Sequence, residues 1–408
     1  MSAFRSELEW IRAQHDELCQ LLVRWARINT GTYHLAGLAR QLEELEHAFA
    51  PLEGRMERRT LPPQRQINDA GEVVEQPVGE ALWIGKRLDA PRQVLLSIHM
   101  DTVFGPDHPF QDVRELDGGR LQGPGVADAK GGLLVMLTAL RALERSDVAR
   151  HIGWQVVINP DEEIGSPGSN DLLRQCAQQC DLGLVFEPAL PDGNLVAARK
   201  GSGNFTVVVR GRSAHAGRDF FHGRNAVAAL ATLVTAMSDL TGARPGLTVN
   251  IARIHGGGPS NMVPDLAVAH LNVRLWQPVD QRFIEEELSA LVEKVNTREG
   301  FSAVLHGGFT APPKPLDAAT EKLLNMVGEC GRELGMVLRW QESGGVCDGN
   351  RLAAAGLPTV DTLGVVGGAI HSSREYVELP SITQRAALTA LLLLKLAAGE
   401  LDWPKKSS

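Results

Sequence analysis

The stretch VLLSIHMD, residues 94–101, decides the class of fold that the sequence predicts. Its first five residues form an apolar run typical of a strand buried in a sheet. His99 and Asp101 follow that run, so two ionisable groups stand at the carboxyl end of the strand. In open α/β sheets, ligands bind outside the carboxyl ends of the strands. We therefore expect an α/β domain with a functional site beside His99.

Three further segments repeat this design. Apolar runs at residues 154–158, 182–186 and 359–366 each precede charged or imidazole side chains. Helical patterns lie between several of the strands, at residues 132–145, 169–178 and 382–398. Strands that alternate with helices predict a mostly parallel sheet, so the ionisable groups should meet at one edge of it.

The middle of the chain follows a different pattern. Strands at residues 204–210, 247–254, 266–275 and 301–305, with helices at 225–240 and 280–297, occur in the order β-α-β-β-α-β. This is the ferredoxin-like order. We expect an inserted α+β domain over residues 201–312, with the α/β domain formed by residues 1–200 and 313–408.

Composition narrows the function classes. The chain has 408 residues, a formal net charge of −8 and no long basic run, so we expect no nucleic-acid partner. Its five cysteines form no disulfide framework, which indicates a reducing compartment. The N-terminus lacks the apolar region of a signal peptide, and the most apolar stretch, residues 386–398, is shorter than the ~20 residues that span a bilayer. We expect a cytoplasmic protein without a membrane partner.

Seven ionisable side chains should gather at the edge of the sheet. Any one of them alone is more often a cap, a turn residue or an ion-pair partner. Carboxylates packed together raise one another's pKa, and a metal cation removes that cost. Two imidazoles and three carboxylates fit two metals that share one carboxylate, and such ligands suit zinc, cobalt or manganese. The candidates are His99, Asp101, Asp128, Glu162, Glu163, Glu187 and His371.

Asp128 lies in a glycine-rich stretch, GPGVADAKGG (residues 123–132), which lacks the signatures of nucleotide binding. A dinucleotide fingerprint needs glycine at the position of Asp128, and a P-loop needs Gly-Lys followed by Ser or Thr. The glycines more simply let the backbone bend so that a carboxylate points into the site.

Six motifs, in order along nearly the whole chain, resemble the M20 family of metallopeptidases. Within that family they are similar to the branch of carboxypeptidase G2 and acetylornithine deacetylase. The resemblance implies a zinc-peptidase-like catalytic domain, with the inserted domain as lid and dimerisation domain. The motifs are HMD (99–101), GVADAKGG (125–132), PDEEIGS (160–166), FEP (186–188), SAHAG (213–217) and GGAIHS (367–372).

The resemblance also implies roles for the candidates. Asp128 would bridge two zinc ions, one held also by His99 and Glu187 and the other by Glu163 and His371. Asp101 would orient the imidazole of His99, as the partners of metal-binding histidines do. Glu162 would be the general base, and the peptide bond between Asp128 and Ala129 would be cis.

Further residues are implied in the inserted domain and beside it. His215 would stabilise the oxyanion in the active site of a partner subunit, so we expect a homodimer; by itself it could be a turn histidine. Asn261 and Arg274 would hold the carboxylate of the substrate, although Arg274 could instead be an exposed strand residue. We also expect Lys200 to face the cleft, and Gly345, in a Gly-Gly-x-x-Asp stretch, to support the substrate side.

Three functions remain open at this stage. The first is a dinuclear zinc hydrolase that cleaves the amide bond of an N-acyl or peptidyl amino acid with a free carboxylate. The second is an N-acetyl-amino-acid deacetylase or dipeptidase on the same scaffold. The third is a binding protein that kept the fold and lost turnover, although no ligand and no base is missing from the motifs.

Overall fold

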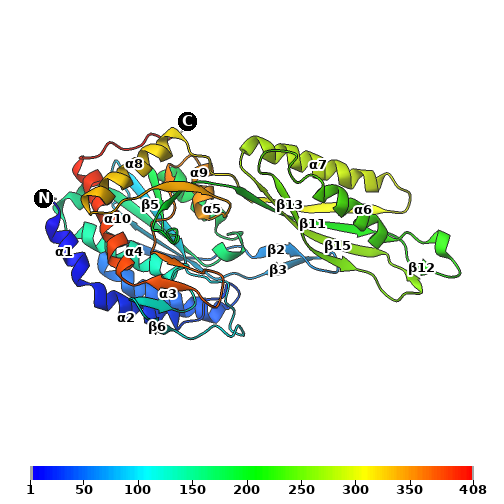
Figure 1. The fold of residues 1–408 in the computed structure, drawn as a ribbon, viewed down its shortest axis with the longest axis horizontal. Helices are drawn as coiled ribbons and strands as arrows, with labels where there is room; N and C mark the ends of the chain where they lie inside the picture. The colour runs from blue at the N-terminus through cyan, green and yellow to red at the C-terminus, as the bar shows by residue number, and fades with distance from the viewer. Residues whose placement is uncertain (1–2, 407–408) are drawn as a thin grey trace.

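The computed structural model describes residues 3–406, which form two bodies joined side by side (Figure 1). The larger body contains both ends of the chain and is built from two segments far apart in the sequence. The smaller body is formed by the chain between them and extends away from the larger one. This arrangement confirms the predicted fold class, an α/β domain interrupted by an inserted α+β domain.

Six strands make the main sheet of the larger body, in the order β1-β4-β8-β5-β9-β18. The last four run parallel to one another, whereas β4 is antiparallel to β8 and to the edge strand β1. The parallel strands coincide with the four apolar runs in the sequence, while the pattern did not indicate β1 and β4. The strands are β1 (Arg55–Arg59), β4 (Ala81–Lys86), β5 (Gln93–His99), β8 (Gly153–Asn159), β9 (Leu182–Val185) and β18 (Thr359–Val360).

Helices cover both faces of this sheet. Alternate residues of a strand point to opposite faces, so Leu96 of β5 enters the larger core and Leu95 enters the smaller one. Helices α4 and α10 pack together in the larger core, and α5 and α9 cover the other face. The helices of this body are α1 (Arg5–Ala13), α2 (His15–Ala26), α3 (Leu35–Phe49), α4 (Lys130–Glu144), α5 (Asn170–Gln179), α8 (Ala318–Glu333), α9 (Asp348–Ala354) and α10 (Pro380–Ala398).

The inserted domain has a four-stranded antiparallel sheet in the order β13-β15-β11-β16, which is the ferredoxin-like order. Its two helices pack on one face of the sheet, and their common core draws on residues between Phe205 and Ala303. The first strand begins at Gly201 and the last ends at Ala311, next to the joins expected from the sequence. The elements are β11 (Gly201–Arg210), α6 (Ala226–Ser238), β13 (Thr248–Gly256), β15 (Leu266–Leu275), α7 (Pro278–Asn296) and β16 (Ser302–Ala311).

A hairpin of the larger body reaches across to the inserted domain (Figure 1). It consists of β2 (Gln64–Ile67) and β3 (Val73–Gln76), in a segment whose composition suggests a loop or a loose hairpin. Asp69 at its turn forms an ion pair of 2.9 Å with Arg253 on the lid sheet. The hairpin therefore adds a noncovalent link to the two chain connections between the bodies.

Short elements complete the structure. One small sheet has the strand order β19-β20-β7-β6. Two further sheets are two-stranded and pair β10 with β17 and β12 with β14. Their bounds are β6 (Arg114–Leu116), β7 (Arg120–Gln122), β10 (Leu195–Arg199), β12 (Ala214–His215), β14 (Met262–Val263), β17 (Trp340–Ser343), β19 (Gly367–Gly368) and β20 (Tyr376–Glu378). The 3-10 turns are η1 (Ala50–Leu52), η2 (Asp147–His151), η3 (Glu162–Ile164) and η4 (Phe220–His222).

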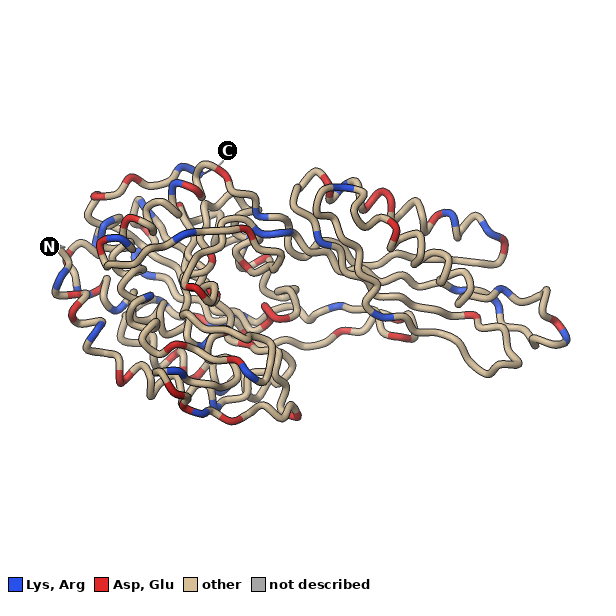
Figure 2. Tube along the Cα trace, viewed as in Figure 1, with Lys and Arg blue, Asp and Glu red and all other residues tan. Residues whose placement is uncertain are grey.

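In the described part of the chain, α10 is the one helix whose length and composition would let it cross a membrane. In this structure 78% of its apolar stretch is buried, because the helix packs against α4 in the larger core. The core of the α/β domain therefore accounts for its apolar character. Lys and Arg are interspersed with Asp and Glu over both bodies (Figure 2).

Candidate active site

The ends of the parallel strands deliver the expected ligands to one place. His99 is the last residue of β5, Glu163 lies in η3 after β8, and Glu187 follows β9 by two residues. Asp128 precedes α4, and His371 lies in the loop between β19 and β20. His371 has a φ of 59°, in the left-handed region that is uncommon for residues other than glycine.

Asp128 lies between the two imidazoles. Its Oδ1 is 3.1 Å from Nε2 of His99, and its Oδ2 is 3.1 Å from Nε2 of His371. Oε2 of Glu163 is 3.1 Å from the same nitrogen of His371, and Oε2 of Glu187 is 3.8 Å from Nε2 of His99. The carboxylate of Asp128 therefore belongs to two groups of side chains. One group also contains His99 and Glu187, and the other contains His371 and Glu163.

Burial and crowding shift the protonation of these groups. Burial raises the pKa of Glu163 to about 7, and the charge of Asp128 adds to the shift. Burial also raises the pKa of Glu162 well above its ordinary value, with a contribution from the charge of Glu187. Hydrogen bonds to Asp128 and Glu163 raise the pKa of His371 to about 11. Burial and mutual repulsion therefore disfavour the charged forms of these glutamates, a cost that a bound cation would remove.

The buried side chain of Asp101 holds two parts of the site in place. Its buried carboxylate accepts hydrogen bonds from the backbone N–H groups of Glu162 and Glu163, each at 3.2 Å, and from the hydroxyl of Thr32 at 2.7 Å. Nδ1 of His99 is 3.0 Å from the carbonyl oxygen of Asp101 and 3.3 Å from its Oδ1. A partner at Nδ1 leaves Nε2 directed toward Asp128, where a metal would bind. Asp101 therefore fixes both the imidazole of His99 and the turn η3, which carries Glu162 and Glu163.

The loop that carries Asp128 is held by Glu375, a residue that the sequence analysis missed. The buried carboxylate of Glu375 accepts hydrogen bonds from the backbone N–H groups of Gly125 (3.2 Å), Ala127 (2.9 Å) and Asp128 (3.0 Å). The Asp128–Ala129 peptide in this loop is cis, as the family resemblance implied. Glu375 lies four residues after the histidine of the GGAIHS motif, and this closeness to a predicted site residue could have suggested it.

Glu375→Gln is expected to weaken metal binding by about 10–100-fold, the usual effect of removing a partner that orients a metal ligand. A glutamine keeps one acceptor oxygen but turns an amide N–H toward backbone donors that need an acceptor. Co²⁺ affinity, measured by competition with a chelator, checks this. Glu378→Gln is the matched control, because Glu378 pairs with Arg120 on the surface. Equal affinities of the two variants would contradict the assignment.

The Gly-Gly-x-x-Asp stretch, residues 344–348, contacts the segment that follows η3. Asp348 accepts hydrogen bonds from the hydroxyl of Ser166 at 2.5 Å and from Nδ2 of Asn159 at 2.8 Å, so it braces the segment after η3. The carbonyl oxygen of Gly345 accepts a hydrogen bond from Nη1 of Arg199 at 3.3 Å. A substrate-side role of Gly345 stays a prediction, since the contacts of this stretch in the structure are with the protein.

Lys200 and its neighbour Arg199 point in different directions. The ammonium of Lys200 donates to the carbonyl oxygen of Gly246 at 2.6 Å and lies 5.4 Å from the centroid of the Trp276 ring, both in the inserted domain. Arg199 is buried and forms an ion pair of 3.0 Å with Asp361. A substrate contact of Lys200 stays a prediction, since its ammonium already has partners in this conformation.

His215 and Asn261 lie together at the far end of the inserted domain. His215 is on β12, and the backbone N–H of Ala216 next to it donates to the carbonyl oxygen of Asn261 at 2.8 Å. Figure 1 shows β12 at the end of the lid opposite to the α/β domain. These two residues are therefore not brought to the His99–His371 cluster within one chain.

Arg274 lies at the other end of the lid sheet, close to the join. It is opposite Ser202 on β11, in the second residue pair of that strand's pairing. Its Nε donates to Oδ1 of Asn272 at 2.8 Å, while its Nη1 is buried and has no hydrogen-bond partner among the described residues. A guanidinium with an unused N–H group is suited to a carboxylate ligand.

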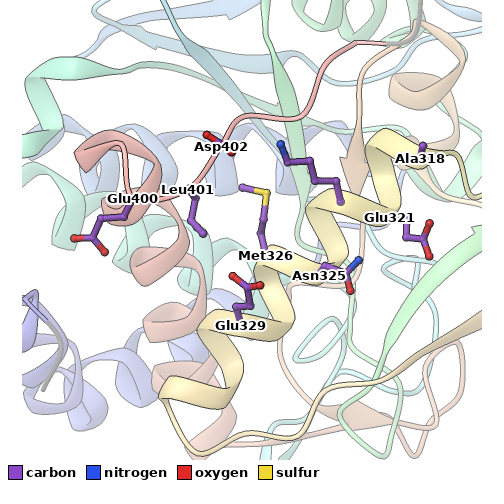
Figure 3. A pocket seen from close by; sticks show the side chains of 9 residues that line it. Ala318, Glu321, Asn325, Met326, Glu329, Glu400, Leu401 and Asp402 are labelled. Carbon is purple, nitrogen blue, oxygen red and sulfur yellow. The ribbon is translucent and has the colours of Figure 1, made fainter.

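A hollow of about 510 Å³ lies between α8 and the segment after α10, away from the Asp128 cluster (Figure 3). It is lined by several acidic residues, but the carboxylates of Glu321 and Glu400 point away from each other in Figure 3. The side chains here do not converge as those around Asp128 do. We therefore assign no role to this hollow.

The sequence matches the family model described as peptidase family M20/M25/M40 over residues 95–395. The chain belongs to the M20 family. It is similar to carboxypeptidase G2 of Pseudomonas sp. (strain RS-16), with 30% identity over 83% of each chain. It is also similar to succinyl-diaminopimelate desuccinylase of Hahella chejuensis, with 27% identity over 80% of this chain and 88% of that protein.

Among solved structures, the fold is similar to that of a dinuclear metal-binding M20 peptidase of Bacillus subtilis. The TM-score is 0.64 at 14% identity, and the match covers 95% of this chain and 99% of the other. Membership of the M20 family makes the protein a metal-dependent hydrolase of amide bonds. This confirms the enzyme prediction over the alternative of a non-catalytic binding protein.

The M20 site offers a donor set that fits divalent cations. Ligand atoms of His99, Asp128 and Glu163 lie within 4.8 Å of one another. Oε1 of Glu187 is buried and has no hydrogen-bond partner among the described residues, which would be costly for a carboxylate unless a cation binds there. The set of imidazole nitrogens and carboxylate oxygens is the kind that zinc, cobalt and manganese accept.

Proposed function

We propose that this M20 enzyme uses two zinc ions to remove an acyl or peptidyl group from an amino acid with a free α-carboxylate. The observation that carries the proposal is the position of Asp128, with one carboxylate oxygen toward each imidazole. Such a carboxylate, flanked by one further glutamate on each side, could be shared by two divalent cations. Cobalt or manganese would support the same reaction, since they accept the same ligands.

Each residue then has a defined task. When bound, two divalent cations make a water molecule nucleophilic at neutral pH and polarise the scissile carbonyl group. Glu162 accepts a proton from the attacking water and delivers it to the departing amine. Burial favours this role, because it brings the pKa of Glu162 upward, toward the working pH. Asp101 and Glu375 hold the ligands in place through the hydrogen bonds described above.

The carboxylate of the substrate is assigned to Arg274. Arg274→Met is expected to lower kcat/KM for substrates with a free α-carboxylate by roughly 10–100-fold, since a hydrogen bond to a charged group contributes about 1.5–3 kcal/mol. The same substitution should leave substrates with an amidated carboxyl group unaffected. A panel of N-acetyl, N-succinyl and N-aminobenzoyl amino acids and of dipeptides, each free and amidated, tests this. Equal losses in both series would remove Arg274 from the substrate site.

The same panel of substrates shows which acyl group the enzyme prefers. The carboxypeptidase G2 and desuccinylase relatives both support hydrolysis next to a free amino-acid carboxylate, but their names indicate different acyl groups. An enzyme that prefers acetyl or succinyl over aminobenzoyl substrates would be a deacylase of small acyl groups. We propose the carboxypeptidase function first, because the identity to carboxypeptidase G2 is the higher of the two.

Metal affinity is expected to rise with pH. Hydrogen bonds raise the pKa of His371 to about 11, and the charge of Glu187 and the hydrogen bond to Asp101 raise that of His99 although burial opposes the shift. The raised pKa values favour the imidazolium forms, and a metal that binds Nε2 must displace the proton there. Each proton released strengthens binding up to ~10-fold per pH unit. Zn²⁺ titrations at pH 6 and pH 8 check this, and an affinity that does not change would contradict it.

We further propose that the enzyme is a homodimer in which His215 acts in the site of the partner subunit. The support is that His215 and Asn261 lie at the lid end far from the metal ligands of their own chain (Figure 1). A cytoplasmic location is part of the proposal, and the five free cysteines, four of them buried, are compatible with a reducing compartment.

A further inference from the structure

A cavity of about 740 Å³ lies between the hairpin β2–β3, the lid sheet and the segment after β8. The hairpin, which crosses from the larger body to the lid, forms one wall with residues 64–67 and Val73 (Figure 1). The lid sheet forms the second wall, with the face that its two helices leave bare. Ile164 and Pro167 of the α/β domain form the third. Ligand sites of this size are frequent between domains.

The hairpin is held on the lid at its tip. The carboxylate of Asp69 is 2.9 Å from Nη2 of Arg253 and 3.5 Å from Nε2 of His270. The carbonyl oxygen of Gly71 accepts a hydrogen bond from Nη2 of Arg210 at 3.3 Å. A Cβ atom at Gly71 would come within 2.7 Å of a side chain on β11, so a glycine lets the tip lie this close. These contacts fix the hairpin as a wall of the cavity.

The cavity begins beside the groups to which we assign the chemistry. Ile164 is in η3, directly after Glu163. On the lid side, Asn272 lines the cavity and accepts the hydrogen bond from Nε of Arg274 at 2.8 Å. From Asn272 the cavity continues along β15 to His270, away from the join between the two bodies. It therefore extends from the expected place of the scissile bond toward the hairpin tip.

The end of the cavity near η3 is apolar. Ile164 and Pro167 line it from the α/β domain, and Phe309 lines it from β16. Phe309 and Pro167 also line a neighbouring hollow of about 500 Å³, so the two side chains lie on the same side of the cavity. The ring of Phe309 packs edge to face on Phe205 at 5.8 Å, which fixes its position. This end is suited to a hydrocarbon chain.

The end below the hairpin tip is polar. Nδ1 of His270 is 3.1 Å from the hydroxyl of Thr206, and the amide of Gln66 lines the cavity from the hairpin. No acidic residue is among the described residues that line the cavity, and the nearby carboxylate of Asp69 is paired with Arg253. This end therefore offers donors to a hydrogen-bond acceptor and no counter-charge to a cation.

We propose that this cavity holds the acyl group of the substrate, and that the hairpin makes the enzyme select acyl chains longer than acetyl with an acceptor group at the far end. The inference rests on the proposed function. With the α-carboxylate of the amino acid at Arg274 and the scissile bond at the metals, the acyl chain is the part that extends beyond the scissile bond. The apolar end of the cavity would hold the chain, and the polar end would hold its tip.

Three substrates with the same amino acid test the preference. The N-acetyl derivative is too short to enter the cavity, the N-hexanoyl derivative fills it with a hydrocarbon chain, and the N-adipoyl derivative has the same length with a carboxylate at its tip. With the Zn²⁺-loaded enzyme, kcat/KM should rise from acetyl to hexanoyl by about 10-fold or more, because each methylene group in an apolar pocket adds to the discrimination. It should rise again from hexanoyl to adipoyl.

Gly308→Leu tests the place of the chain. Gly308 lines the cavity, and a Cβ atom built on it meets nothing within 4 Å, so a leucine would fill the space without a clash. We expect kcat/KM for the hexanoyl and adipoyl substrates to fall by about 10-fold or more, and that for the acetyl substrate to stay unchanged. Ser302→Leu is the matched control, because Ser302 is an exposed residue of the same strand that does not line the cavity.

Gln66→Leu tests the role of the hairpin. Loss of the amide should lower kcat/KM for the adipoyl substrate by about 3–10-fold, the effect of one hydrogen bond, and should not lower that for the hexanoyl substrate. Gln76→Leu is the matched control, because Gln76 is on the other strand of the hairpin and does not line the cavity.

The outcomes separate this inference from the proposed function. Equal rates for the three substrates, or equal losses for all three in Gly308→Leu, would overturn the acyl cavity and keep the hydrolytic function. A Gly308→Leu enzyme that changes its preference among amino acids, with acetyl as the common acyl group, would assign the cavity to the amino-acid side chain and also overturn the inference. A Zn²⁺-loaded enzyme that hydrolyses no N-acyl amino acid would contradict the proposed function itself.

Discussion

Glu162→Gln is expected to lower kcat/KM by about 10²–10⁴-fold, the range that general acid–base groups contribute. Glutamine has the size of the native side chain but cannot take the proton of the attacking water. The backbone N–H group of Glu162, which bonds to Asp101, is not changed by the substitution. Metal content and thermal stability should therefore stay close to those of the native enzyme, so the loss should appear in the rate alone.

The control for this prediction is Glu329→Gln. Glu329 lines the acidic hollow beside α8, away from the Asp128 cluster, so its substitution should leave the rate unchanged (Figure 3). Steady-state kinetics of both variants, after reconstitution with Zn²⁺ and metal analysis, provide the measurement. A Glu162→Gln enzyme with two bound ions and native activity would exclude Glu162 as the base.

Asp361→Asn is expected to lower the free energy of unfolding by about 3–5 kcal/mol, the usual cost of breaking a buried ion pair by removing one partner. The carboxylate of Asp361 binds Nη2 of Arg199 at 3.0 Å and Nζ of Lys314 at 2.7 Å, and all three side chains are buried. An asparagine would leave two cations in the interior without a counter-charge. The group lies where the chain enters and leaves the inserted domain, since Arg199 and Lys314 also exchange backbone hydrogen bonds.

Urea unfolding at a fixed Zn²⁺ concentration measures this effect. Glu286→Gln is the matched control, because Glu286 forms an exposed pair with Arg282 on α7 at 2.7 Å. Exposed pairs of this kind contribute only about 0.3–0.5 kcal/mol. If the two substitutions cost the same, the ion pair at the joins does not stabilise the fold as we infer.

The parallel strands and the ionisable groups at their ends were predictable because both signals are local. A buried strand such as residues 94–98 is apolar throughout, and the residue after it falls at the carboxyl edge of the sheet whatever the details of packing. The strand β1, with sequence RMERR, was not predictable in this way. It is an edge strand with mostly solvent-exposed side chains, so hydrophobic pattern carries no information about it.

The supports of the site depend on contacts between segments far apart in the sequence. Glu375 is 247 residues from Asp128, and Asp361 is 162 residues from Arg199, so no spacing rule connects them. The directions of Arg199 and Lys200 could not be decided either, because adjacent residues on an extended segment point to opposite sides. Motif resemblance identified the groups expected to do the chemistry, whereas the structure was needed to find what holds them.

The number of metal ions bound per chain tests the central claim most directly. Native mass spectrometry of the Zn²⁺-loaded enzyme should find two ions per chain in the native protein and neither ion held tightly in Asp128→Ala, because that carboxylate is shared by both ligand groups. A native protein that saturates with one ion, or an Asp128→Ala protein that retains two, would contradict a dinuclear site bridged by Asp128.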